Sequence, residues 1–232
     1  MSKNIIFRPI SRDSQNIAPK PMPAKKYFPE WYKSIPKFED GKMIIRDKGR
    51  ANVTMKSCMP FFDTFTTGYI QETWCDIYID ASGDEVEWRF SSQPQIIEYR
   101  STRHRYPKID GFSDIEFSWR QPWIPQLPSG YSMMYTHPLN RFDLPFLSLT
   151  GIIDNDKYYM ESEANHPFFI KENFKGIIPA GTPMFQMIPI KRESWKSSFE
   201  DHEEDFLYNF SGIQKYFYDG YKKLFWQKKE YN

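Results

Sequence analysis

The stretch Gly176-Ile-Ile-Pro-Ala-Gly-Thr-Pro-Met-Phe-Gln-Met-Ile-Pro-Ile-Lys-Arg192 separates two parts of the chain that differ in sequence pattern. Its glycines and prolines are typical of a turn, and the apolar run that follows predicts a core strand over 184–190. Before this stretch the sequence indicates short strands and loops. After it the sequence indicates one long amphipathic helix. We therefore expect a β domain that is joined through this strand to a C-terminal helix.

Composition favours a β fold and limits the classes of function. Of the 232 residues, 40% are hydrophobic and 18% are aromatic, and 18 are prolines. Aromatic residues favour strands, and frequent proline disfavours a helical bundle. The net charge of +1 gives no overall attraction to nucleic acid or to an anionic membrane, and no apolar run is long enough for a membrane span. We therefore expect neither nucleic acid nor a membrane as a partner.

Alternating apolar and polar residues predict roughly ten short strands joined by turns, as in an antiparallel barrel or sandwich. The clearest hairpin pairs 74–80 with 85–90. The other strands are expected at 4–10, 52–58, 95–100, 113–119, 131–136, 147–153, 157–160 and 164–170. We expect them to form a jelly-roll or cupin-like domain over 51–196.

The two ends of the chain differ from this β domain. Residues 1–50 are expected to form a proline-rich arm, extended over 11–26, with a short aromatic helix that begins at Pro29 and ends before Pro36. A capping box at the start of 197–232 predicts a helix over those residues, packed on the β domain or on a partner subunit. Its apolar face consists of Phe206, Phe210, Ile213, Phe217, Tyr221 and Leu224.

The sequence lacks the common patterns of catalytic and cofactor sites. It has no Gly-x-Ser-x-Gly nucleophile motif and no P-loop, and no histidine pair has the spacing of a cupin metal site. Cys58 and Cys75 show no zinc-ligand spacing and are interpreted as buried apolar residues in a reducing cytosol. We therefore predict no metal and no cofactor, and the catalytic residues, if any, stay unknown.

The loop 136–143 holds the densest group of polar side chains. A second His-Pro dipeptide begins at His166, and in a closed β fold two such loops can meet at one rim, where their side chains could bind a ligand. The candidate ligand-binding residues are Asp63, His137, Asn140, Arg141, Asp143, His166, Gln186, Lys191 and Arg192.

Structural roles stay open for several of these residues. Asp63 lies in the hydroxyl-rich stretch 59–70, where a tight turn would use its side chain and neighbouring hydroxyls to satisfy local backbone groups. Lys191 and Arg192 are equally explained as the exposed end of a strand.

Four strings in the chain are similar to those of one protein family. They are Cys58-Met-Pro-Phe-Phe-Asp-Thr-Phe-Thr-Thr-Gly-Tyr69, Tyr135-Thr-His-Pro-Leu-Asn-Arg-Phe-Asp-Leu-Pro-Phe146, the opening stretch continued to Trp195, and Lys222-Lys-Leu-Phe-Trp226. They resemble an uncharacterised family, a domain of unknown function, encoded by tailed phages of marine cyanobacteria and related bacteria. The resemblance spans the chain from about Phe28 onward. It implies a phage gene expressed in the host cytoplasm. No catalytic residue is carried over from the family, because no activity is established for it.

Two functional hypotheses follow. The first is a phage-encoded, non-enzymatic binding or assembly protein that associates with itself or with another phage protein, with a structural role in the virion as one form. The second is a cupin-like β-barrel that binds a small molecule or metal at the 136–143 loop. This second hypothesis includes the case in which the chain is an enzyme.

Overall fold

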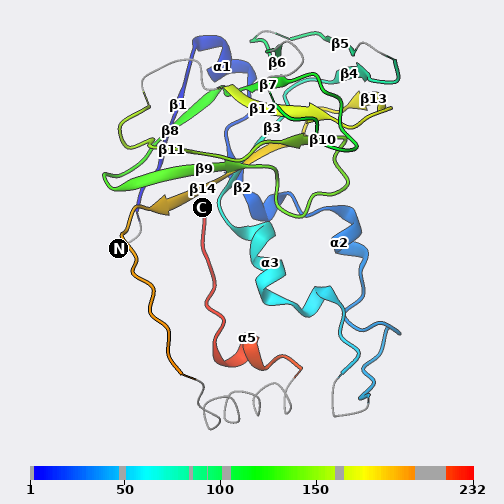
Figure 1. Cartoon of the computed structure of the whole chain (residues 1–232), viewed down its shortest axis with the longest axis vertical. Coiled ribbons are helices and arrows are strands. Elements are labelled where there is room, and N and C mark those ends of the chain that lie inside the picture. Colours follow the sequence, from blue (N-terminus) through cyan, green and yellow to red (C-terminus); the bar gives the residue numbers. More distant parts are fainter. Residues whose placement is uncertain are drawn as a thin grey trace. The chain divides into compact units, whose positions relative to one another are not determined.

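The computed structural model describes residues 3–46, 51–83, 86–92, 94–100, 106–159, 165–201 and 218–232 (Figure 1). The chain divides into two compact units. Unit 1 consists of residues 1–24, 68–192 and 232, and unit 2 consists of residues 25–67 and 193–231.

The described part of unit 1 is mainly β and contains one short helix, α1 (Arg12–Ile17). Its strands are β1 (Ile6–Pro9), β2 (Met22–Pro23), β3 (Tyr69–Glu72), β4 (Ile77–Asp80), β5 (Glu87–Phe90), β6 (Ile97–Tyr99), β7 (Phe117–Arg120), β8 (Trp123–Gln126), β9 (Tyr131–Thr136), β10 (Phe146–Ser148), β11 (Gly151–Ile153), β12 (Asn165–Ile170), β13 (Lys175–Ile178) and β14 (Pro183–Lys191).

The described strands form four antiparallel sheets. Their strand orders are β11-β9-β14-β3-β2, β10-β12-β7-β6, β13-β4-β5 and β1-β8. In Figure 1, β9 and β14 lie below β7 and β12. The predicted strand 184–190 is confirmed as part of β14, which pairs with β3 on one side and β9 on the other. It is therefore an interior strand of the five-stranded sheet.

The core of unit 1 lies between these sheets. Trp119 of β7 is fully buried, stacks on Phe168 of β12 at a centroid distance of 3.8 Å, and donates its indole N–H to the Ser148 hydroxyl at 3.0 Å. That hydroxyl donates to the Met184 carbonyl of β14 at 2.7 Å, which links the four-stranded sheet to the five-stranded one. Ile77 and Ile79 of β4 belong to the same core, so three sheets contribute to it.

The predicted jelly-roll or cupin-like barrel or sandwich is wrong. The strands are divided among separate sheets that do not close into a barrel. Many strands have three or four residues, and one edge strand, β2, has two and contains Pro23. Because proline lacks an N–H group, it cannot donate to a further strand, and such an edge does not propagate the sheet.

The predicted single strand over 147–153 is also wrong, because two strands occupy this region. The Leu149 N–H still donates to the Pro167 carbonyl of β12 at 2.8 Å, whereas the Thr150 hydroxyl bonds to the Thr136 hydroxyl of β9 at 2.8 Å. The chain therefore passes from the four-stranded to the five-stranded sheet between these two residues. Alternation alone does not reveal such a change of sheet.

Local hydrogen bonds override three other predictions. The arm expected to be extended over 11–26 contains α1, because the Ser11 hydroxyl accepts the Ser14 N–H at 3.0 Å as an N-cap. The strand expected at 52–58 is only isolated bridges and a 3-10 turn, η3 (Met55–Ser57), which Thr54 caps. Residues 157–159 form no strand, because the Lys157 N–H closes a turn onto the Asp154 carbonyl. The predicted hairpin of β4 with β5 and the strand over 131–136 are confirmed.

Unit 2 is built on short helices and aromatic packing. Its described residues form the helices α2 (Glu30–Ser34), α3 (Met59–Thr66) and α5 (Gly220–Leu224), and the turn η1 (Ala24–Lys26) precedes them. Tyr32 of α2 packs on Phe65 of α3 at 4.7 Å, and Phe28 stacks on Tyr32 at 5.6 Å. The aromatic helix expected after Pro29 is confirmed.

The tight turn predicted over 59–70 is instead the helix α3. Its threonine hydroxyls do satisfy local backbone groups, since Thr64 donates to the Phe61 carbonyl at 2.7 Å and Thr67 to that of Asp63 at 2.8 Å. Cys58, at the N-cap of α3, is exposed, and Cys75 is half-buried, so the prediction that both are buried is wrong.

The predicted long helix over 197–232 is wrong. Residues 197–201, where the capping box was expected, have no helical structure, and after residue 217 the described chain is helical only in α5. The apolar residues Phe206, Phe210, Ile213 and Phe217 lie outside the described residues. Gly220 lies at the start of α5, and glycine costs about 1 kcal/mol relative to alanine within a helix, which opposes a continuous helix here. Among the described residues, none of the helices has the length and apolar character that crossing a membrane requires.

Candidate functional site

The loop 136–143 is held in place by strand β14. Buried Gln186 of β14 accepts the Leu139 N–H at 2.9 Å through its side-chain oxygen. Asn140 has a φ of 58°, a left-handed conformation that asparagine tolerates better than most residues. Gln186 and Asn140 therefore shape this loop, and both were predicted as ligand-binding residues.

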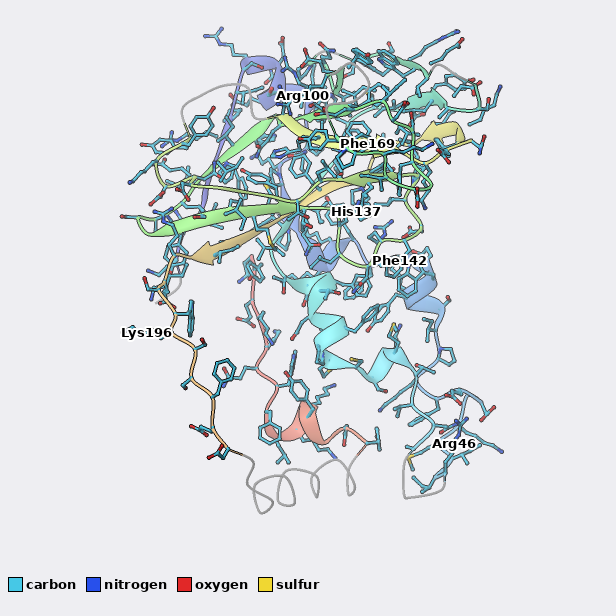
Figure 2. The ribbon with its side chains drawn as sticks, in the orientation of Figure 1. Arg46, Arg100, His137, Phe142, Phe169 and Lys196 are labelled. Atoms are coloured by element: carbon cyan, nitrogen blue, oxygen red, sulfur yellow. The ribbon has the colours of Figure 1, made fainter. Side chains whose placement is uncertain are left out.

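His137 uses both ring nitrogens on the backbone around it. Its Nδ1 accepts the Ser148 N–H at 3.3 Å, so its Nε2 carries the proton and donates to the Arg141 carbonyl at 3.1 Å. Burial lowers the pKa of His137, which favours the neutral ring. Figure 2 labels His137 among the strands and Phe142, which is 73% exposed, on the loop that follows. His137 therefore supports the loop rather than facing a ligand.

Arg141 and Asp143 line a groove of about 420 Å³ in unit 1. They form a forked ion pair, with Arg141 Nε to Asp143 Oδ1 at 2.9 Å and Nη2 to Oδ2 at 2.8 Å. The turn that contains Gly181 and the residues on either side of it also line the groove, so the groove connects the 136–143 loop to the stretch 176–192. Because the two charges bind one another, the groove presents little net charge.

His166 lies in the core of unit 1 and not at a rim. It stacks on Tyr135 with a centroid distance of 4.3 Å and donates its Nε2–H to the Gln121 side-chain oxygen at 3.0 Å. The Tyr135 hydroxyl donates to Asn155 at 3.0 Å. Burial lowers the pKa of His166 to about 3, with a smaller contribution from Arg100, so the ring is neutral near pH 7. It is a buried structural residue.

Arg192 clamps two turns of unit 1. Its guanidinium donates to the Tyr131 carbonyl at 3.0 Å, to Asp154 at 3.0 Å, and to both carboxylate oxygens of Asp156. Asp156 also accepts the Gly130 N–H at 2.9 Å. The guanidinium and this N–H together lower the pKa of Asp156 to about 2. Lys191, in contrast, is exposed at the end of β14.

Removing the Arg192 side chain is expected to lower the melting temperature by several degrees. The reason is that Asp156, whose side chain is only 2% exposed, would keep its charge without the guanidinium. Arg192→Lys should recover only part of the loss, because lysine keeps the positive charge but its ammonium cannot bond to both carboxylate oxygens as the guanidinium does. Thermal denaturation of Arg192→Ala, Arg192→Lys and Arg89→Ala tests this.

Arg89 is the matched control, since its ion pair with Glu87 is long, at 3.7 Å, and both side chains are largely exposed. Equal melting temperatures for Arg192→Ala and Arg89→Ala would contradict a clamp.

Asp63 belongs to unit 2, where its carboxylate bonds to two C-terminal residues. Both of its carboxylate oxygens accept the Trp226 indole N–H, at 3.0 and 3.1 Å, and Lys229 pairs with it at 2.5 Å. Asp63 thus joins α3 to the C-terminal residues. The remaining eight candidates lie in unit 1.

The predicted residues are therefore brought together only in part. Arg141 and Asp143 share a groove, whereas His137 and His166 have no hydrogen-bond partner in common among the described residues. Within those same residues, no three side chains of His, Cys, Asp or Glu are grouped as metal ligands.

Two features of the structure were not predicted from the sequence. One is a pocket of about 420 Å³ in unit 2, lined by Phe28, Tyr32, Lys33, Lys56, Met59, Phe62, Lys222 and Trp226. The other is the extended segment 193–201, which carries two strongly exposed aromatic side chains. The pocket combines segments far apart in sequence, and only the aromatic density around residue 30 hinted at it.

No protein-family model matches the chain, and a comparison with curated proteins finds no match. The resemblance to phage proteins therefore stays a prediction that rests on the four quoted strings.

Proposed function

We propose that the chain is a phage-encoded, non-enzymatic binding or assembly protein that associates with itself or with another phage protein. The observation that carries this proposal is the segment 193–201. It forms no helix or strand, and it presents Trp195 at 86% exposure and Phe199 at 96% exposure. Figure 2 labels Lys196, which belongs to this extended segment.

Large aromatic side chains are the usual anchors of protein interfaces. Tryptophan in particular is enriched among the residues that dominate binding energy, and burying one large apolar side chain contributes about 1.5–3 kcal/mol. An extended segment can insert such side chains into a partner with little rearrangement of the rest of the chain. Trp195 and Phe199 are therefore proposed as anchors for a partner protein.

The roles of the chemically active side chains also support binding over catalysis. His137, His166, Arg192 and Asp63 each hold parts of the fold together through the bonds described above. A catalytic group must instead meet a substrate while keeping a suitable pKa. These four residues are committed to structure.

Trp195→Ser with Phe199→Ser is expected to abolish the association while leaving the fold intact, because both side chains are exposed. Native mass spectrometry of the purified chain would show oligomers for the wild type and a monomer for the double variant. If the partner is another phage protein, the wild type would copurify with particles and the variant would not.

The matched control is Lys196→Ser with Glu200→Ser, which changes two exposed polar residues of the same segment. It should behave as the wild type. A wild-type chain that is monomeric and also absent from purified particles would overturn the proposal.

We also propose a second candidate function, retention of a small ligand in the groove beside Arg141 and Asp143, because the groove joins the predicted loop to the turn at Gly181. The same native spectra would reveal it as an added mass that dissociates on collisional activation. A spectrum without such a mass, together with no small molecule in extracts of the purified protein, would refute it.

A further inference from the structure

We propose that the pocket of unit 2 is a binding site for a small aromatic anion, meaning a molecule with a flat ring system and a single carboxylate. This site is independent of segment 193–201 and of the assembly proposal. Its volume of about 420 Å³ lies in the range of small-molecule sites, and one unit supplies all its lining residues.

Four of the eight described lining residues, Phe28, Tyr32, Phe62 and Trp226, are aromatic, and we call this part of the lining the floor. Phe28 stacks on Tyr32 with planes 14° apart, and Phe62 stacks on Phe28 at 5.6 Å. Trp226 meets Phe62 edge to face at 6.5 Å, and Met59 adds a thioether. Aromatic rings prefer stacked or edge-to-face neighbours, and methionine adapts to irregular apolar shapes. The floor therefore suits a flat ring system.

The Trp226 side chain is held in place by its hydrogen bonds to Asp63. Its indole N–H donates to both oxygens of Asp63, and Lys229 pairs with the same carboxylate while lying 5.9 Å from the indole centroid. The ring is thus oriented by hydrogen bonds that a ligand does not need to replace. A preformed wall of this kind lowers the entropy cost of binding.

The pocket lining also contains three lysines, and they differ in their hydrogen-bond and ion-pair partners. Lys33 is paired with Glu30 at 2.5 Å. Lys56 donates to the Tyr32 and Lys33 carbonyls at 2.7 and 3.1 Å and lies 4.7 Å from the Tyr32 ring centroid, so two of its three N–H groups are already bonded. Lys222 is exposed and has no hydrogen-bond or ion-pair partner among the described residues.

This charge distribution selects the ligand class. Among the described residues, the pocket lining contains three lysines and no acidic residue, so it favours an anion. Only Lys222 and part of Lys56 are available, and two donors match one carboxylate rather than a polyanion such as nucleic acid. The apolar floor in turn disfavours small hydrated ions, which would gain nothing from it. An aromatic monocarboxylate fits both the lysine donors and the apolar floor.

The test compares three probes of the same shape by isothermal titration calorimetry: 2-naphthoate, its neutral amide and 2-naphthylmethylammonium. We expect saturable binding of one 2-naphthoate per chain, weaker binding of the amide and weakest binding of the ammonium. Equal affinity for 2-naphthoate and its amide, or no saturable binding of 2-naphthoate, would overturn the proposal.

Two variants locate the site. Lys222→Met keeps the apolar stem and should weaken 2-naphthoate by about threefold to tenfold without changing the amide. Lys223→Met is the matched control, because Lys223 pairs with Asp219 at 3.1 Å and does not line the pocket, and it should bind as the wild type. The Trp226 indole N–H resonance, assigned with Trp226→Phe, should shift on titration with 2-naphthoate. Unchanged affinity in Lys222→Met or an unshifted resonance would place the ligand elsewhere.

Discussion

Gly68→Ala is expected to destabilise unit 1 by about 4 kcal/mol or more, a loss that point substitutions reach only rarely. A Cβ at Gly68 would lie 2.1 Å from the Met187 carbonyl oxygen, and real Cβ contacts do not approach so closely. Met187 belongs to β14 and pairs with Tyr69 of β3, so the obstacle is backbone within the five-stranded sheet. Either the backbone at Gly68 or that at Met187 must move, and hydrogen bonds hold both segments in place. The φ of Gly68, +75°, adds strain for any other residue.

Gly130→Ala separates these two causes. Its φ is +84°, which resembles that of Gly68, but nothing lies within 4 Å of the Cβ that alanine would add. The left-handed conformation alone costs about 1–2 kcal/mol. Chemical denaturation should therefore show a much larger loss for Gly68→Ala than for Gly130→Ala. Similar losses in both variants would mean that Gly68 is not pressed against Met187.

Lowering the pH from 7 to 4 is expected to remove about 3 kcal/mol of stability through His166. The pKa of His166 is about 3 in the folded chain because of burial, against an ordinary value of 6.5 in the unfolded chain. Between these two values the unfolded state binds the proton and the folded state does not. Stability therefore falls as the pH falls from about 6.5 toward about 3, and above pH 6.5 this contribution is constant.

The contrast variant is His166→Gln, which keeps an N–H donor for Gln121 but has no proton to gain. Its unfolding free energy should vary less between pH 7 and pH 4 than that of the wild type. Asp154 and Asp156 also have lowered pKa values, but their ordinary value is 3.8, so they act mainly below this window. His137 has a lowered pKa too and contributes in the same direction, so His137→Gln is measured beside it. Parallel pH profiles for wild type and His166→Gln would refute the assignment.

Strands with a regular alternation of apolar and polar residues were predictable from the sequence. The places where a short segment forms a helical turn instead of a strand were not. Residues 131–136 and the β4–β5 hairpin show the two-residue alternation of strands, and they are strands. Residues 52–58 alternate as well, yet the Thr54 side chain caps a 3-10 turn within them. Short segments satisfy both periods, and one capping hydrogen bond is enough to choose between them.

The candidate site shows a similar division. Polar density pointed to the 136–143 loop as a ligand-binding site, and Arg141 and Asp143 of this loop line a groove. It did not reveal that Gln186 holds the loop through the Leu139 N–H, or that His166 is buried against Tyr135. Residue type shows that a side chain can form polar bonds. Its partner depends on which strands become neighbours.

The sequence by itself determined the mainly β composition of the chain, the interior strand β14 and the absence of common catalytic motifs, because these depend on local pattern and residue type. Only the tertiary structure decided that the sheets stay separate, that most candidate site residues act as internal braces, and that Lys222 and Trp226 share a pocket with Phe28. These outcomes depend on contacts between residues far apart in the chain, whose formation is governed by packing and burial, and no local pattern encodes them.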